Sequence, residues 1–315
     1  MPDRALNEQL DQAIEALLAG TTTPAADSEL SALMEIAGTL RDLPEENFKA
    51  RLGAELERRA SMPVSNTTGT SSHTVTPFIT VPDGAGLIEF MKRTFGAEEL
   101  NRHAHRPEGG FVARVRIGDT NILIMEEESA RGRESLVALH VYVPDCDAAY
   151  QRALDAGAKS MGEPKDQVYG ERAGFVQDPA GNQWYIATHL GPTPALAGLW
   201  TVTPFVHHVH VREYMEFLKR AMSAEQLVLH EHGGRVVYGA VRIGDAVLEM
   251  GERESTLKSS FYWYVNDVDA AYARAVAAGA TGIVPPADQP FGDRIAVLHD
   301  PFGFQWIAAK HLVEE

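Results

Sequence analysis

Two stretches of this chain are versions of one another, and this internal repeat limits the possible folds more than any other feature. The sequence Thr-Val-Thr-Pro-Phe at 74–78 recurs at 201–205, and Val-Arg-Ile-Gly-Asp at 115–119 recurs at 241–245. The period is far longer than the roughly 20–50 residues of solenoid repeats. The sequence therefore predicts a duplicated domain. Positions that agree between the copies are candidates for scaffold, and positions that differ are candidates for function.

Periodicity and composition set the boundaries of the parts. Apolar residues recur at helical spacing in 1–60, which predicts a helical N-terminal region. The serine- and threonine-rich segment 61–73 is expected to be a flexible linker. The first repeat then occupies 74–190, a second linker occupies 191–200, and the second repeat occupies 201–315.

Within a repeat, one order of elements occurs twice. In the first repeat, a β run at 78–81 precedes a helical pattern at 88–95 and three further β runs. The order then begins again with a β run at 137–143 and a helical pattern at 148–156. The sequence thus predicts an α+β fold of two tandem domains, each made of paired βαβββ modules and preceded by a small α-helical region.

Charge and cysteine content limit the classes of partner. The chain has 28 basic and 44 acidic residues, for a net charge of −16. Nucleic acids and anionic membranes reward basic surfaces, so neither is expected as a partner. No apolar run approaches the roughly 18 residues of a membrane span, and the N-terminus lacks a secretory apolar core. With the single cysteine, Cys146, these features favour a cytoplasmic protein, and the acidic charge is compatible with a cationic ligand.

Five motifs carry a resemblance to a known family. They are Thr76-Pro77-Phe78, Arg116-Ile117-Gly118-Asp119, Leu139-His140-Val141-Tyr142-Val143-Pro144-Asp145, Tyr169-Gly170-Glu171-Arg172 and Asp178-Pro179-Ala180-Gly181-Asn182-Gln183-Trp184. With the module order, they resemble the vicinal oxygen chelate superfamily, and within it the PhnB-like glyoxalase/bleomycin-resistance branch. The resemblance implies paired modules that form a ligand-holding cup. Because single-domain relatives tend to dimerise, it also implies an intramolecular pseudo-dimer of the two repeats, with further oligomerisation left open.

Metal-using members of this family take a His or Gln from the first strand of each module and a Glu from the last. The equivalent first-strand positions here are Thr76, Ala138, Thr203 and Ser260, and the last-strand positions are Ile124, Tyr185, Glu249 and Ile307. Only Glu249 has the expected chemistry. His207 with Glu249 is the remaining candidate for a Zn, Ni, Mn or Fe site, with Tyr262 or water completing it. The other interpretation of His207 is a strand residue without a metal.

The cups are expected to be aromatic and mildly polar. Candidate ligand-binding residues are Phe78, Thr80, His140, Tyr142 and Tyr185 in the first repeat, and Phe205, His207, Glu249, Tyr262 and Tyr264 in the second. His140 could also approach Glu126, or simply line the pocket. Such a lining suits a planar or partly apolar molecule held by stacking and a few hydrogen bonds. Ordinary core packing is the alternative interpretation of these residues.

The remaining shared residues indicate structure. Asp-Pro-x-Gly is a turn sequence, and Trp184 and Trp306 are expected in the core. Arg172 and Arg294 are expected to form structural ion pairs or backbone contacts, with anion binding as the alternative. The favoured function is metal-independent binding of a small, aromatic or cationic molecule. The alternative is a divalent-metal-dependent lyase/isomerase or dioxygenase that uses the second domain, so whether the chain is an enzyme stays open. A third hypothesis gives the N-terminal helices an adaptor role.

Overall fold

A computed structural model describes residues 73–312, apart from 105–108, 192–198 and 256. The helical region and most of the linker expected before residue 73 lie outside the described residues. Within the described part, no helix has the length and apolar character needed to span a membrane.

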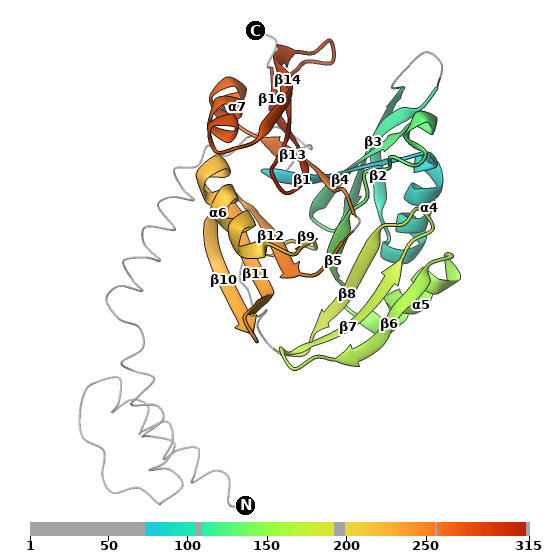
Figure 1. The fold of residues 1–315 in the computed structure, drawn as a ribbon. Helices are drawn as coiled ribbons and strands as arrows, with labels where there is room; N and C mark the ends of the chain where they lie inside the picture. Colours follow the sequence, from blue (N-terminus) through green and yellow to red (C-terminus); the bar gives the residue numbers. More distant parts are fainter. Residues whose placement is uncertain (1–72, 105–108, 192–198, 256, 313–315) are drawn as a thin grey trace, which may run out of the picture. The chain divides into compact units, whose positions relative to one another are not determined.

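The two repeats each fold into two βαβββ modules, which confirms the predicted fold class (Figure 1). The first repeat contains β1 (Val75–Val81), α4 (Gly84–Phe95), β2 (Glu98–Ala104), β3 (Phe111–Ile117), β4 (Thr120–Glu126), the short 3₁₀ helix η1 (Glu128–Ala130), β5 (Ala138–Tyr142), α5 (Cys146–Asp155), β6 (Lys159–Asp166), β7 (Glu171–Gln177) and β8 (Gln183–His189). The second contains β9 (Val202–His208), α6 (Val211–Met222), β10 (Glu225–His232), β11 (Arg235–Ile243), β12 (Ala246–Glu252), β13 (Ser260–Tyr264), α7 (Val268–Ala277), β14 (Thr281–Asp288), β15 (Asp293–His299) and β16 (Gln305–His311).

Local sequence explains where the helices begin. The carboxylates of Asp83, Asp145 and Asp267 accept hydrogen bonds from the backbone amides of Gly86, Ala148 and Ala270, respectively, in the first turns of α4, α5 and α7. An aspartate at this position satisfies an amide that the helix itself leaves without a partner. Helix α4 ends at Gly96, whose φ of 69° is readily adopted only without a side chain.

The strands form two eight-stranded sheets, and each sheet takes one module from each repeat. Sheet A has the order β14-β15-β16-β13-β1-β4-β3-β2, and sheet B has the order β10-β11-β12-β9-β5-β8-β7-β6. The seams are antiparallel pairs of first strands, β1 with β13 and β5 with β9. The sequence analysis assigned one set of candidate residues to each repeat, whereas each sheet combines a module from both repeats. The cup residues are divided between sheets A and B, and each sheet combines residues of both repeats.

The apolar cores, in contrast, mostly follow the repeats. One cluster of buried side chains packs α4 and α5 against strands of the first repeat, around Trp184. The other packs α6 and α7 against strands of the second repeat, around Trp306. Both tryptophans are fully buried, as predicted. The helices therefore cover one face of each sheet and leave the opposite face, called here the helix-free face, for side chains that the core does not need.

Two reciprocal contacts join the repeats at the ends of the seams. The carboxylate of Asp119 accepts a 2.8 Å hydrogen bond from the backbone amide of Thr201, and that of Asp245 accepts a 2.7 Å bond from the amide of Thr74. Beside each aspartate is a glycine with positive φ. A Cβ on Gly244 would lie 2.2 Å from Oγ1 of Thr74, and Gly118 has the same relation to Thr201. The shared Ile-Gly-Asp sequence thus serves to hold one repeat against the other.

The other shared residues have structural roles, as predicted. The indole of Trp184 donates to Asp178, and that of Trp306 donates to Asp300, both at 2.9 Å. The guanidinium of Arg172 pairs with Asp147 and Asp166, and that of Arg294 pairs with Asp269 and Asp288. These contacts repeat between the copies and explain why the sequences agree there.

A candidate site on the helix-free face of sheet B

The helix-free face of sheet B gathers titratable and aromatic side chains from both repeats. The strand register places three residues in one row across the sheet. Phe205 of β9 lies between Glu249 of β12 and Ala138 of β5. Because alternate residues of a strand share a face, this face also has other side chains at neighbouring positions. They are His140, Tyr142, Glu171, Tyr185, His189, Thr203, His207 and Tyr238.

The centre of this face is a histidine between two carboxylates. Nδ1 of His140 lies 3.0 Å from Oε2 of Glu249, and Nε2 lies 3.5 Å from Oε2 of Glu171. The side chain of His140 is 12% exposed, while those of Glu171 and Glu249 are 5% and 1% exposed. Buried carboxylates are stable only when charges or hydrogen bonds compensate them. The imidazole supplies both carboxylates with that compensation.

The environment fixes the charge of this triad, which consists of His140, Glu171 and Glu249. Burial alone lowers the pKa of His140, but the charge of Glu249, the hydrogen bond to it and the nearby carboxylate of Glu171 outweigh this effect and raise the pKa to about 9. Burial alone would raise the pKa of Glu171, yet the contact with His140 lowers it overall. At neutral pH His140 is thus an imidazolium between two carboxyl groups, and the formal charges of the three side chains sum to a negative value.

Two tyrosines each add a hydrogen bond to one of the carboxylates, while Oε2 of Glu171 is buried without a hydrogen-bond partner among the described residues. The hydroxyl of Tyr238 donates to Oε1 of Glu249 at 2.6 Å, and that of Tyr142 donates to Oε1 of Glu171 at 3.1 Å. Burial raises the pKa of both phenols, helped by the nearby carboxylates, so both remain protonated donors. The ring of Tyr142 also stacks on His189, with centroids 4.4 Å apart. Aromatic side chains therefore surround the triad.

His207 belongs to a second, separate group on the same face. Its Nε2 lies 2.5 Å from the hydroxyl of Tyr185, and its Nδ1 lies 3.4 Å from the carbonyl oxygen of Gly251. Burial, followed by the charge of Arg253, lowers the pKa of His207 to about 4. His207 is thus neutral at physiological pH. The ring of Phe205 lies between this group and the rest, 4.8 Å from His207 and 5.3 Å from Tyr185.

The helix-free face of sheet A is different in character. Phe78, Leu123 and Ile307 are buried there, and Met125 and Tyr262 pack against them. Thr80 and Tyr264 lie on the same face by alternation along β1 and β13. Sheet A thus has Leu123 and Tyr262 where sheet B has Glu249 and His140, while Asp293, which pairs with His311, keeps the carboxylate of Glu171. The two faces have diverged in chemistry while their strands have kept the same order.

The structure corrects three sequence-based assignments. The counterpart of Glu249 is Leu123, not Ile124, because Leu123 aligns with Phe78 as Glu249 aligns with Phe205. Ile124 points into the core, since a shift of one residue reverses the face. Tyr262 lies on sheet A and cannot complete a site with His207 and Glu249 on sheet B.

The expected approach of His140 to Glu126 is also wrong. Glu126 belongs to β4 of sheet A, and its carboxylate accepts a hydrogen bond from the backbone amide of Ala85 at the start of α4. His140 instead contacts Glu249, because β5 joins β9 and β12 in sheet B. Sequence reasoning placed these partners in different cups, since it paired modules within a repeat.

Sequence analysis also missed Glu171, Tyr238 and His189 as members of the site. Glu171 was present in the motif Tyr-Gly-Glu-Arg, but that motif was used only as evidence of the family resemblance. A signal existed in the comparison of copies, because Val112 stands in β3 where Tyr238 stands in β11, and Asp293 stands where Glu171 stands. Only the pairing of modules from different repeats shows that these positions meet.

The donor set does not fit a metal centre. Among the residues that the structure describes, no group of three or more His, Cys, Asp or Glu side chains is arranged to hold a metal ion. The two nitrogens of His140 face different carboxylates, so no common point lies at bonding distance from three donors. His207 makes its contacts to Tyr185 and Gly251 rather than to Glu249. The arrangement of these side chains therefore supports no reaction step through the family's metal.

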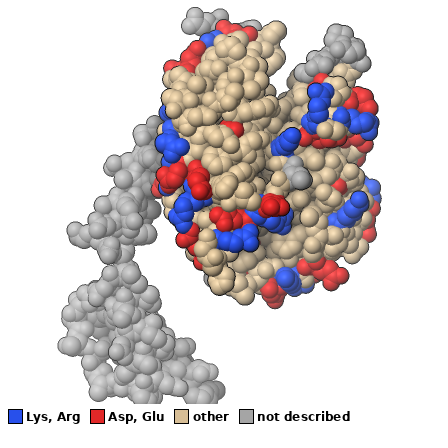
Figure 2. Space-filling model, in the orientation of Figure 1, with Lys and Arg blue, Asp and Glu red and all other residues tan. Residues whose placement is uncertain are grey.

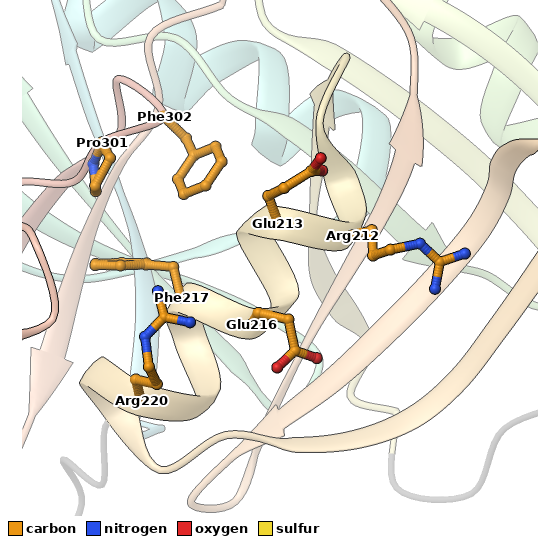
Figure 3. Close-up of a pocket in the computed structure, with 7 residues that line it drawn as sticks. All are labelled: Arg212, Glu213, Glu216, Phe217, Arg220, Pro301 and Phe302. Atoms are coloured by element: carbon orange, nitrogen blue, oxygen red, sulfur yellow. The ribbon is translucent and has the colours of Figure 1, made fainter.

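A hollow elsewhere on the surface has a different construction. It lies beside α6, has a volume of about 380 Å³, and has Phe217, Pro301 and Phe302 as its apolar part. Figure 3 shows the two phenylalanine rings between the loop of Pro301 and the helix, with charged side chains of α6 around them. Figure 2 shows basic and acidic side chains intermingled on the visible face of the molecule. Neither feature gathers polar groups as sheet B does.

Comparison with known proteins agrees with this architecture. The family model described as Glyoxalase/Bleomycin resistance protein/Dioxygenase superfamily matches residues 70–186 and 210–307, which is more than half of the chain. The chain belongs to this superfamily. Uncharacterized protein Rv0887c of Mycobacterium tuberculosis is 34% identical over 121 residues, which cover 35% of this chain and 71% of that protein.

Solved structures support the fold independently. The crystal structure of glyoxalase I from Zea mays aligns with a TM-score of 0.60 at 15% identity, and the alignment covers 75% of this chain and 91% of that one. At this level of identity the likeness concerns the fold alone. The function must be argued from the residues of this chain.

Proposed function

We propose that the helix-free face of sheet B binds a small aromatic cation without a metal ion. The observation that carries the proposal is the geometry of the triad: two buried carboxylates flank the imidazolium of His140, and Oε1 of Glu171 also lies 3.4 Å from Nδ1 of His189. A cationic ligand near this site would meet a net negative charge in a partly buried setting, where electrostatic attraction is stronger than in water.

The aromatic side chains of the same face supply the second part of the recognition. Tyr142, Tyr185 and Phe205 line it, and the ring of Phe175 lies 5.0 Å from that of Tyr185 in an edge-to-face arrangement. Faces of aromatic rings attract cations and stack on planar ligands. Charge and rings together favour a planar cation over either a simple ammonium ion or an aromatic anion.

Isothermal titration calorimetry with three probes tests this function. Ethidium combines rings and positive charge, tetramethylammonium has charge alone, and 2-naphthoate has rings with the opposite charge. We expect saturable binding of ethidium and weaker binding of the other two. The variant Glu249→Gln should weaken ethidium binding by about tenfold or more, the effect of losing one charged contact. The matched control Glu163→Gln removes an exposed carboxylate of β6 and should leave binding unchanged.

Equal affinity for ethidium in the wild type and in Glu249→Gln would contradict the proposal. Bleomycin is a further probe, because the family includes bleomycin resistance proteins. Elemental analysis of protein purified without chelators addresses the competing function, a divalent-metal enzyme. Stoichiometric Zn, Ni, Mn or Fe would favour that enzyme, and the narrower PhnB-like assignment stays a prediction.

The pairing of repeats also supports a proposal about assembly. We infer that the two repeats together correspond to a pair of single-domain chains, since β1–β13 and β5–β9 join them in both sheets. In that arrangement the chain needs no second copy to complete the triad. Light scattering on the purified protein should give the mass of one chain, and triad-dependent ligand binding should not depend on protein concentration.

A further inference from the structure

A polar cavity of about 520 Å³ lies at one end of sheet A, away from the triad. Its walls are the loop after β4, the loop that enters β13, and the ends of β15 and β16. These loops connect successive modules, so the cavity is formed where the joints of the two repeats meet. The expected ligand-binding residue Thr80 contributes to the wall.

The floor of this cavity is a continuous run of hydrogen bonds. Oγ of Ser135 lies 2.7 Å from Oγ of Ser260, which lies 3.1 Å from Oε1 of Gln305. Nε2 of Gln305 then lies 3.3 Å from Nε2 of His299. Hydroxyl, amide and imidazole groups in a row can each turn toward a polar ligand, because each is both donor and acceptor.

The internal repeat shows that the fold does not require this floor. The counterparts of Ser260 and His299 in sheet B are Ala138 and Gln177, and they stand at the same positions of the same strands. Sheet B thus forms with neither the hydroxyl nor the imidazole. The hydroxyl of Ser260 and the imidazole of His299 are therefore specific to sheet A, whereas Gln305 has the counterpart Gln183 in sheet B.

Charges of both signs surround the floor. Lys258 and Arg133 line the cavity, and within the described residues neither has a carboxylate at ion-pair distance. Glu134 and Glu127 line it as well; Oε1 of Glu134 accepts from the backbone amide of Gly132, and Oε1 of Glu127 accepts from the hydroxyl of Ser129. The formal charges of these four side chains cancel.

We propose that this cavity binds a small zwitterion of the size of a free amino acid. A carboxylate would be held by Lys258 and Arg133, an ammonium group by Glu134 and Glu127, and polar side-chain atoms by the hydroxyl floor. Charge-assisted hydrogen bonds of this kind are stronger than neutral ones. A purely anionic or purely cationic ligand would leave two charged side chains facing a ligand charge of their own sign.

Three related probes test this proposal on the intact chain by calorimetry. L-Serine has both charged groups and a hydroxyl, 3-hydroxypropanoate lacks the ammonium group, and ethanolamine lacks the carboxylate. We expect saturable binding of L-serine, with affinity at least about tenfold above that of either fragment. Equal affinity for 3-hydroxypropanoate, or no saturation by L-serine, would overturn the proposal.

Variants locate the binding within the molecule. Lys258→Met and Glu134→Gln should each weaken L-serine binding by about tenfold, whereas Lys159→Met, which removes an exposed lysine of β6, should not. Unchanged binding in both cavity variants would refute the assignment. A thermal melt of each variant confirms that it is folded, and the comparison of probes on the wild type needs no variant. Glu249→Gln should leave L-serine binding unaffected, which separates this cavity from the site on sheet B.

Discussion

His140 and Glu249 come from different repeats, and their side chains meet across the seam of sheet B with Nδ1 3.0 Å from Oε2. The contact exists because β5 pairs with β9, which in turn pairs with β12. Neither repeat contains the pair by itself. The site thus depends on the association of the repeats as much as on the residues, and its charge balance can be tested directly.

Glu249→Gln should lower the pKa of His140 from its value of about 9, because the charge of Glu249 is the largest contribution that raises it. Histidine-selective NMR over a pH titration measures this shift. Glu163→Gln, on exposed β6, serves as the control with the same change of charge. An unaltered titration of His140 in Glu249→Gln would show that the contact is absent in solution.

The combined contribution of His140 and His207 to stability should be greatest near pH 6.5. The pKa of His140 is raised from 6.5 to about 9, so its contribution is complete below pH 6.5 and is lost as pH rises through 9. The pKa of His207 is lowered from 6.5 to about 4, so stability is lost as pH falls from 6.5 through 4. Thermal midpoints across this range measure both limbs. His207→Asn should flatten the acid limb and leave the alkaline one, and an identical acid limb would refute the role of His207.

Gly244→Ala should destabilise the chain by more than about 2 kcal/mol, since it adds a steric clash to the cost of a left-handed alanine. The new Cβ would lie 2.2 Å from Oγ1 of Thr74 at the contact between repeats. Gly233→Ala is a close control, because Gly233 has a φ of 59° against 61° and no atom within 4 Å of the added carbon. Urea denaturation of both variants isolates the clash, and equal losses would argue against the contact.

Trp306→Phe should cost about 3 kcal/mol, because it removes the indole donor to buried Asp300 and leaves a small cavity. The pKa of Asp300 is already raised to about 6 by burial, and the hydrogen bond from Trp306 limits this rise. Its loss should raise the pKa further. Denaturation of Trp306→Phe with and without Asp300→Asn measures the coupling, and additive effects would show that the bond contributes nothing.

Much of the fold could be predicted from the repeat and from local patterns. Turn sequences such as Asp178-Pro179-Ala180-Gly181 and the buried indoles of Trp184 and Trp306 recur with their roles intact. These features depend on residues that are close together in the sequence, so they can be recognised from the sequence alone. The module order follows for the same reason.

The candidate site was only partly predictable, for a reason that lies in the pairing of modules. His140, Tyr142, Phe205 and Glu249 were identified as facing a ligand, and the structure places them on one face of sheet B. Their partners were not identified, because pairing β5 with β9 rather than β1 is a choice between similar strands. That choice depends on long-range contacts such as Asp119 with Thr201. The local sequence pattern does not indicate which of the two strands pairs with β5.

The exchange of modules between repeats has a consequence for evolution. In an assembly of two identical chains, every mutation appears twice and alters both binding faces together. In this chain the two copies of a strand are encoded separately, so a single codon change reaches only one of them. Leu123 and its counterpart Glu249 differ in this way. Fusion of the repeats thus allows the two faces to differ: Leu123 and Tyr262 occupy on sheet A the positions that Glu249 and His140 occupy on sheet B, while both sheets keep the same strand order.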